Sequence, residues 1–469
     1  MLQTQILPTS LTSLLALLRP CFTGPSFRTF TALVAGMIAQ PGRRTITGML
    51  TGAGLAGVWH HSRAYWFFGH ARWCVTQVST ALTRLVVSHL LPGDAPVLIA
   101  VDDTLFHRSG RKVHATAWHH DGAATGPRRN KVAWGNNWVI AAIVVTLPFH
   151  DRPVSLPVAF ALWTKGGPTK QVLACRLVSI IAAATNHPDH PDHPDHPDHP
   201  DRPRRPVHVV ADAWYAGADG APGATVGANR ERGLPTLVSL TSRLRANAKL
   251  HAIAVPTPGK GGRPKRIGAV LGTPKQIAAT TTAWTTTQVT RYARTTTVHI
   301  ADLHCLWYGV YRSRTVRVLL VRDPNSTAKA GYDLALITTD LTSTAADLVA
   351  RYAARWSIEV AIEDAKQTTG IGQARNRTAT AVARTVPFGF TAQTLVVCWY
   401  TLHGHHPDTV TQRRAQAPWY RSKTQPSYHD MIIKLRRVII TARFRAGKAA
   451  NPTPHETRAV LLAWAEAAA

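Results

Sequence analysis

The sequence predicts an α/β protein in which a mixed sheet forms the core, a β-rich insertion interrupts it, and helical and basic regions flank it. Two apolar, β-branched segments, 96–104 and 207–215, contain aspartate where their apolar runs end, as buried strands often do. Residues 1–95 carry apolar side chains at helical spacing. Residues 352–366 combine an apolar and a polar helix face. These observations favour a sheet that delivers acidic side chains to one edge.

Residues 1–95 are expected to form a helical domain. Residues 63–91 carry aromatic and aliphatic side chains at helical spacing and end at a Pro-Gly-Asp turn, which predicts a packed helical hairpin. Residues 40–50 place a turn with Arg43 and Arg44 before another helix, as in a helix-turn-helix. The apolar residues 11–18 indicate a first helix and not a signal peptide, because no basic segment precedes them.

Residues 96–215 are expected to supply the first part of the core. One strand reaches Asp102-Asp103-Thr104, and the apolar residues 134–145 predict another long strand. A helix at about 169–185 and a strand ending at Asp212 complete the order strand-strand-strand-helix-strand. Asp102 and Asp103 are neighbours on one strand, so their side chains point to opposite faces and only one of them reaches a given site.

A repeat separates that helix from the Asp212 strand. The triplet His187-Pro188-Asp189 occurs five times in succession and ends at Asp201. Proline at every third position excludes both helix and sheet ladder, which predicts an extended linker. Clustered His and Asp bind divalent metals weakly, but slippage in a short DNA repeat explains the array more simply. We expect no catalytic role for it.

The segment between Asp212 and Glu359 contains 146 residues (359 − 213), too many for a plain connection. Within it, residues 216–340 are expected to form a β-rich insertion, with strands at 286–300, 306–311, 316–321 and 334–338. A glycine-rich loop adds cations suited to a phosphate backbone: Lys260, Arg263, Lys265 and Arg266.

Tyr352, Arg355, Glu359 and Lys366 are predicted to lie along one helical stripe, within about 60° of arc. A carboxylate flanked by two cations and a phenol suits phosphodiester chemistry, where positioning and charge neutralisation supply most of the catalysis. The alternative is a solvated helix face with an ion pair between Arg355 and Glu359. This helix belongs to the second part of the core, residues 341–402, which a helix over 378–402 closes.

The net charge favours a nucleic-acid partner. Lys and Arg number 54 against 25 Asp and Glu, a formal charge of +29, and such an excess attracts polyanions. A GC-rich genome would also raise the arginine content, but it gives no reason for acids to be so few. The basic region 403–469 is expected either to contact a DNA backbone or to present solvated helix faces.

The cysteines and the apolar runs indicate where the protein works. Five scattered cysteines without a C-x-x-C pair favour a reducing compartment and argue against a zinc site. No uncharged apolar run of membrane-spanning length is evident. We therefore expect a cytoplasmic protein with no membrane partner.

The spacing Tyr-x2-Arg-x3-Glu-x6-Lys, followed by Gly370 and the basic residues Arg375, Arg377 and Arg384, resembles the signature of insertion-sequence DDE transposases. The resemblance implies an RNase H-like core with an acidic triad of Asp103, Asp212 and Glu359 as catalytic residues and metal ligands. The family places its first aspartate directly before the threonine, which favours Asp103, with Asp102 as the alternative. The resemblance also implies two Mg²⁺ ions, for which Mn²⁺ can substitute.

The same resemblance implies the partners and the reaction. Arg355 and Lys366 would clamp phosphates of double-stranded DNA, and Tyr352 would contact the same strand. The helical N-terminal domain would recognise terminal inverted repeats, and two copies would form the synaptic complex. The product would be ends cut from an element and joined to target DNA. Trp284 or Trp307 of the insertion would stack on a flipped base, unless it is a core residue.

Other function classes remain open on the sequence alone. A non-transposing nuclease or resolvase of RNase H-like fold would share the acids but cut branched or arbitrary DNA. A catalytically inactive relative would bind the terminal repeats without cutting them. A glycosidase with paired carboxylates leaves the positive charge unexplained.

Overall fold

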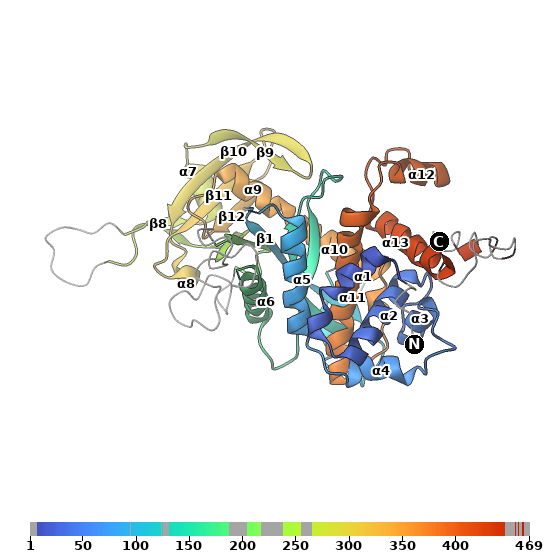
Figure 1. Cartoon of the computed structure of the whole chain (residues 1–469). Helices are drawn as coiled ribbons and strands as arrows, with labels where there is room; N and C mark the ends of the chain where they lie inside the picture. Colours follow the sequence, from blue (N-terminus) through green and yellow to red (C-terminus); the bar gives the residue numbers. More distant parts are fainter. Residues whose placement is uncertain are drawn as a thin grey trace.

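The computed structural model describes residues 7–93, 95–122, 124, 131–186, 204–216, 238–254 and 265–445, together with 455, 458, 462 and 463. These residues form a mixed α/β structure with a large sheet and helices around it (Figure 1). The strands gather on one side of the view and most N-terminal and C-terminal helices on the other. The predicted array of His-Pro-Asp triplets lies outside the described residues.

A ten-stranded sheet runs through the structure in the order β2-β3-β1-β5-β6-β12-β11-β10-β9, with β4 paired to β3. β7 and β8 form a second sheet of two strands, and His251 of β7 pairs with Leu306, directly after β10. The strands are β1 (Val97–His107), β2 (Ala117–His120), β3 (Val132–Val145), β4 (Val154–Leu162), β5 (Val207–Ala211), β6 (Val238–Arg243), β7 (Leu250–His251), β8 (Val270–Gly272), β9 (Thr285–Arg291), β10 (Arg294–Cys305), β11 (Val316–Arg322) and β12 (Leu334–Thr338).

The order β4-β3-β1-β5-β6 within this sheet is consistent with an RNase H-like core. β1 is antiparallel to β3 and parallel to β5, and β5 is parallel to β6. The crossover from β4 to β5 contains α6 (Lys170–Thr185), close to the helix predicted at 169–185. β12, β11, β10 and β9 continue the same sheet beyond β6, so the strands of residues 285–338 extend the core and do not fold back into a sheet of their own.

Two strand predictions in the insertion are wrong in detail. Residues 286–300 form a hairpin of β9 and β10 and not one strand, because the chain turns at Tyr292 and Ala293, which have φ angles of 53° and 62°. Two consecutive left-handed residues are the geometry of the tight turns that join twisted hairpins. Residues 306–311, predicted as a strand, instead contain the short helix α8 (Tyr308–Tyr311).

Threonine side chains begin many of the helices. Thr23, Thr45, Thr169, Thr273 and Thr344 each accept a hydrogen bond from a backbone N–H of the first helical turn, which satisfies a donor that the helix itself leaves free. Besides α6 and α8, the α-helices of the described residues are α1 (Thr9–Ala16), α2 (Gly24–Ala39), α3 (Ile46–Gly52), α4 (Ser62–Gly69), α5 (Val75–Leu90), α7 (Pro274–Thr280), α9 (Ala345–Ala354), α10 (Trp356–Gln367), α11 (Ala379–Trp399), α12 (Thr409–Gln416) and α13 (Tyr428–Arg445).

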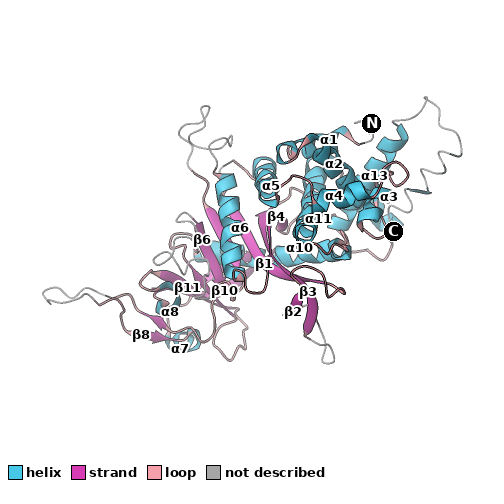
Figure 2. Cartoon of the chain, turned by 90° about the horizontal axis from the view of Figure 1, so that it is seen from below, coloured by secondary structure: helices cyan, strands magenta, loops and turns pink. Residues whose placement is uncertain are grey.

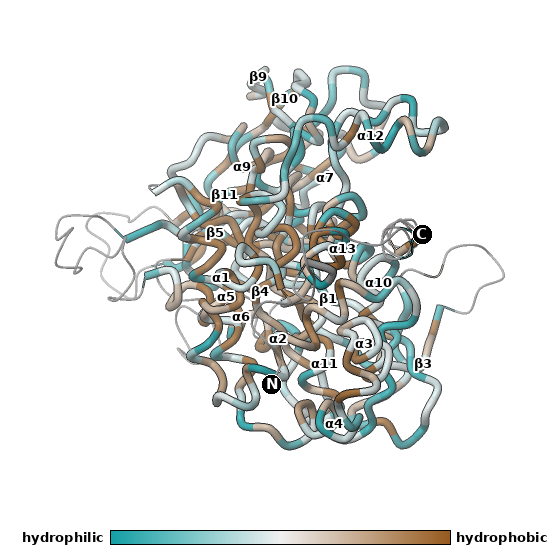
Figure 3. The backbone as a smooth tube through the Cα atoms, turned by 45° about the vertical axis from the view of Figure 1, so that its right-hand side comes forward, coloured by the Kyte–Doolittle hydropathy of each residue, from teal (hydrophilic) through white to brown (hydrophobic). Residues whose placement is uncertain are grey.

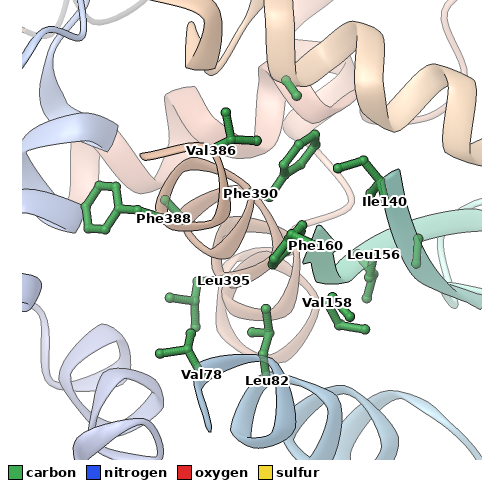
Figure 4. Packing of buried hydrophobic residues seen from close by; sticks show 14 of the residues in the cluster. Val78, Leu82, Ile140, Leu156, Val158, Phe160, Val386, Phe388, Phe390 and Leu395 are labelled. Carbon is green, nitrogen blue, oxygen red and sulfur yellow. The ribbon is translucent and has the colours of Figure 1, made fainter. Parts of the chain in front are cut away.

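The helix α11 occupies the centre of the largest apolar cluster. Phe388, Phe390 and Leu395 are buried against residues of α4, α5 and β4, including Leu82 and Phe160 (Figure 4). Figure 2 shows this helix between the sheet and the other helices. The backbone colouring of Figure 3 places the apolar segments inside and many polar ones at the periphery. The mostly apolar composition of α11 suits a helix that is buried on all sides.

The α11 region also corrects one expectation about membranes. Residues Ala379–Gly404 form a helix that is long and apolar enough to cross a bilayer by length and composition, yet 89% of its most apolar window is buried inside the structure. Residues 385–403 contain no Asp, Glu, Lys or Arg, so the expectation that no uncharged run of this length occurs is wrong. Its burial by other elements marks it as a core helix.

The predicted helix-turn-helix corresponds to α2 and α3, but its arginines are divided between two roles. Arg43 is exposed, whereas the backbone N–H of Arg44 donates to the side chain of Gln373, just beyond α10. Helices α2 and α3 approach closely at Gly36, which has no side chain. A Cβ atom there would lie only 1.9 Å from the carbonyl oxygen of Met49. The turn therefore docks on the core as well as facing solvent.

Two arginines of the C-terminal region have structural roles. Arg436 is buried and donates to the carbonyl oxygen of Ile38 at the end of α2. Arg443 donates to the carbonyl oxygen of Gly52 at the end of α3. Both stabilise helix C-termini, where carbonyl groups lack partners. Neither of the roles expected for this basic region, DNA-backbone contact or a solvated face, describes them.

Candidate active site

Asp102 and Asp212 are brought together by the pairing of two parallel strands. β1 pairs with β5 in a register that ends at Val101 opposite Ala211, so Asp102 is the next residue on β1 and Asp212 is the first residue after β5. Residues in register on parallel neighbours point to the same face, and neighbouring strands lie about 4.8 Å apart. The two carboxylates influence each other, because Asp212 helps to raise the pKa of Asp102.

Glu359 and Asp102 both contact the side chain of Arg355. Arg355 donates from Nη2 to Oε1 of Glu359 at 2.7 Å, and its Nη1 lies 3.4 Å from Oδ2 of Asp102. The Arg355 side chain is only 14% exposed. Its Nε is buried and has no hydrogen-bond partner among the described residues. One guanidinium thus links the carboxylate of β1 to the carboxylate of α10.

Burial disfavours the ionised form of the Asp102 side chain. It raises the pKa of Asp102 to about 7, and the nearby carboxylates of Asp103 and Asp212 act in the same direction. Arg355 and the backbone N–H of Asp103 oppose this shift without cancelling it. A carboxyl group in this position gains from any further cation that reaches it.

Asp103 lies on the other face of β1 with different partners. Its Oδ2 accepts a hydrogen bond from Nζ of Lys170, at the start of α6, at 2.6 Å. Its Oδ1 accepts one from the hydroxyl of the fully buried Tyr215 at 3.3 Å. The structure therefore places Asp102 near Asp212 and links Asp102 to Glu359 through Arg355, and it pairs Asp103 with Lys170.

Lys170 and Tyr215 were not singled out in the sequence. Their signal was weak: Tyr215 follows Asp212 by three residues, and Lys170 opens the predicted helix. Burial raises the pKa of Tyr215 well above its ordinary value, and Asp103 contributes to the shift. Tyr215 therefore stays protonated and acts as a hydrogen-bond donor.

The helix signature is interrupted at Arg355. α9 ends at Ala354 and α10 begins at Trp356, and Arg355 keeps helical angles of −52° and −36° between them. The backbone N–H of Arg355 donates to the carbonyl oxygen of Tyr352, and the carbonyl oxygen of Arg355 accepts from the backbone N–H of Ile358. Both hydrogen bonds span three residues. Tyr352 thus lies on α9, while Glu359 and Lys366 lie on α10. From this position Arg355 contacts Asp102 of β1 as well as Glu359 of α10.

Tyr352 and Lys366 flank the carboxylates. The Arg355 guanidinium lies 5.9 Å from the centre of the Tyr352 ring. The ammonium of Lys366 lies 5.6 Å from the centre of the Phe106 ring. Burial lowers the pKa of Lys366, while Asp121 and Asp102 oppose that shift. Both side chains are half-buried and border the acidic site.

The residues predicted for the basic loop and for base stacking have different surroundings. Lys260 and Arg263 are outside the described residues, whereas Lys265 and Arg266 are exposed before β8. Trp307 is a buried core residue at 7% exposure. The ring of Trp284 is covered by the guanidinium of Arg322, 4.2 Å from the ring centre. Both tryptophans therefore have the core role weighed as the alternative to base stacking.

The donor set fits a divalent cation in chemistry but not yet in arrangement. Asp102, Asp212 and Glu359 offer the hard carboxylate oxygens that Mg²⁺ prefers, and Asp102 is short of positive charge. Within the described part of the chain, however, no group of three or more His, Cys, Asp or Glu side chains is placed to hold a metal ion. Arg355 occupies oxygens of two of the acids.

Comparison with known proteins adds a family. The family model described as DDE superfamily endonuclease matches residues 17–302, which include the helical N-terminal region and the strands bearing Asp102 and Asp212. The match ends before Glu359, so the third acid rests on the helix signature and on its contact with Arg355. A search of curated proteins finds no match.

Proposed function

Because the chain belongs to the DDE superfamily endonucleases, we propose that it is the transposase of an insertion sequence, a nuclease that cuts DNA at element ends and joins them to target DNA. The observation that carries the proposal is the link that Arg355 makes between Asp102 and Glu359, beside Asp212. The proposal is supported by an acid of β1 and an acid of α10 that share one arginine, by the charge of Asp212 acting on the first of them, and by cations that suit phosphate.

Asp102, Asp212 and Glu359 are the proposed holders of two Mg²⁺ ions, with Mn²⁺ as a substitute. When bound, the ions neutralise charge on the attacking and leaving oxygens of an in-line displacement at phosphorus. What supports Asp102 over Asp103 is the effect of the Asp212 charge on it and its contact with Arg355. Asp103 positions β1 through Lys170 and Tyr215.

The cationic side chains have the role of binding the DNA strand. Arg355 and Lys366 bind phosphate oxygens on either side of the scissile bond, as guanidinium and ammonium groups do. Tyr352 packs against the same strand and, beside Arg355, orients it. Exposed Lys265 and Arg266 contact the backbone farther away. The formal charge of +29 supports binding of double-stranded DNA.

The partners are terminal inverted repeats, target DNA and a second copy of the chain in the synaptic complex. The proposed location is the bacterial cytoplasm, at the nucleoid. The second candidate function, a nuclease or resolvase that does not transpose, uses the same acids. The register of Asp102 and Asp212 supports both functions equally, so the substrate separates them.

The test uses purified protein, Mg²⁺ and DNA that carries the element ends, with arbitrary duplexes and branched DNA for comparison. Cleavage at the ends is expected to disappear in Asp212→Asn and Glu359→Gln while DNA binding survives. Glu363→Gln is the matched control, since Glu363 is exposed on the same helix and hydrogen-bonds Gln367. Preference for branched DNA would favour a resolvase, and binding without cleavage in any divalent ion would favour an inactive relative.

A further inference from the structure

Arg355 holds the oxygens that a metal ion would need. Its two terminal nitrogens contact Glu359 and Asp102, at 2.7 and 3.4 Å. A Mg²⁺ ion would bind such oxygens at about 2.1 Å. Two cations on the same pair of oxygens repel each other strongly where water is scarce, and the Arg355 side chain is only 14% exposed. Metal binding and this double ion pair therefore compete.

The same arginine has an unused donor. Its Nε is buried and has no hydrogen-bond partner among the described residues. A guanidinium offers five N–H donors and binds phosphate in a two-pronged manner. A DNA phosphate that engages Nε and one terminal nitrogen would satisfy this donor and withdraw Arg355 from at least one carboxylate. Arg355 is the single residue between α9 and α10.

We infer that Arg355 is a placeholder cation that keeps Asp102 and Glu359 together in the absence of DNA and moves to a phosphate when DNA binds, so that metal binding depends on DNA. This inference rests on the proposed function and names a regulation of its site. In free protein Arg355 blocks the acids, and in the DNA complex it releases them. By linkage, DNA raises the affinity for metal by the same factor as metal raises the affinity for DNA.

The device has a physical advantage for a nuclease. Without a placeholder, three crowded carboxylates would either repel one another or take up metal ions at any time. With Arg355 in place, the acids stay close and the site becomes competent only beside its substrate. Lys170 has the corresponding position next to Asp103 on the other face, so one of the two adjacent aspartates keeps its ion pair throughout.

The test measures Mn²⁺ binding directly, from the resonance signal of the free ion, with full-length protein and a mixed-sequence DNA duplex. Wild type is expected to bind Mn²⁺ weakly alone and at least about tenfold more tightly with DNA. Arg355→Gln should bind Mn²⁺ about tenfold more tightly than wild type without DNA, and DNA should add little. Arg355→Lys, which cannot span both carboxylates with two nitrogens, should fall between them.

Two controls make the measurement specific. The double variant Asp102→Asn, Glu359→Gln retains the His-Pro-Asp triplets and is the blank for weak binding there. Arg243→Gln removes an exposed cation whose charge also acts on Tyr352, and it should leave the affinity for Mn²⁺ nearly unchanged. Melting temperatures confirm that each variant is folded.

The outcomes separate the inference from the proposed function. Equal or weaker Mn²⁺ binding by Arg355→Gln without DNA, or a DNA effect that survives this substitution, would overturn the placeholder role. If Mn²⁺ binding above the blank is absent from wild type and from every variant, with and without DNA, the metal site itself is wrong and the proposed function fails with it. If Arg243→Gln increased the affinity for Mn²⁺ as much as Arg355→Gln does, the loss of any nearby positive charge would explain the result, and the inference would also be overturned.

Discussion

Asp102 and Asp212 lie one residue beyond Val101 and Ala211, the last paired residues of two neighbouring parallel strands. The charge of Asp212 acts on Asp102, while Asp103, the next residue on β1, points to the other face and pairs with Lys170. Strand register thus separates two adjacent aspartates that the sequence left as alternatives. The separation leads to the first prediction.

Asp102→Asn is expected to reduce metal-dependent cleavage by at least about a hundredfold, because loss of a ligand costs at least as much as loss of the group that orients one. Asp103→Asn should keep most of the cleavage but lower the free energy of unfolding by about 1–3 kcal/mol, since Lys170 and Tyr215 lose a charged partner. Cleavage assays and denaturant titration of both variants measure this. A greater loss of cleavage in Asp103→Asn would return the catalytic role to that residue.

The basic residues after the helix signature should differ in their effect on DNA binding. Arg375 and Arg377 are exposed, so replacing either with Gln should reduce the salt dependence of DNA affinity by about one unit of slope. Arg384 instead donates to the carbonyl oxygens of Phe68 and Trp73. Arg384→Gln should leave the slope unchanged and lower the melting temperature. Binding measured across a salt series distinguishes these roles, and a reduced slope in Arg384→Gln would contradict them.

A buried histidine should make stability fall in mild acid. His208 contacts the hydroxyls of Ser239 and Thr241 and faces Asp340 and Arg351. Burial lowers its pKa below the ordinary value. As the pH falls below about 6.5, the unfolded chain takes up a proton that the folded chain refuses, so the free energy of unfolding decreases down to the folded pKa.

Asp340 does not offset this loss, because its pKa lies well below its usual range owing to His208 and to hydrogen bonds from Ser343 and Thr342. Denaturant titrations between pH 8 and pH 5 should show a shallower decrease for His208→Gln, which is also less stable overall by about 1–3 kcal/mol. His114→Gln, at an exposed position, is the control. Identical pH profiles for wild type and His208→Gln would refute the assignment.

The close approach of α2 and α3 should make Gly36 intolerant of a side chain. A Cβ atom there would meet the Met49 carbonyl oxygen at 1.9 Å and its carbon at 2.9 Å, so backbone must move. Gly36→Ala is expected to cost about 1–3 kcal/mol of stability. Gly57→Ala is the matched control, because no atom lies within 4 Å of its added Cβ. Equal melting temperatures for the two variants would show that the helix pair adjusts freely.

Local patterns predicted much of the fold. The apolar runs that become β1, β3 and β5 are rich in β-branched residues, and the residues of α10 have helical spacing. Errors arose where a turn or burial overrode the pattern. Tyr292 and Ala293 turn a predicted strand into a hairpin. The helix over 378–402 is confirmed as α11, but its uncharged stretch is long enough to cross a membrane, contrary to the expectation from the sequence.

The sequence by itself determined the chemistry of the site: Asp212 and Glu359, the cations Arg355 and Lys366, and a choice between Asp102 and Asp103. These features depend on residue type and on spacing along one strand or helix. Only the tertiary structure decided which aspartate faces the others, which cation each acid holds, and which arginines stabilise helix ends. Those outcomes depend on register and packing between segments more than a hundred residues apart, such as Asp102 with Arg355, and spacing along the chain carries no record of such distances.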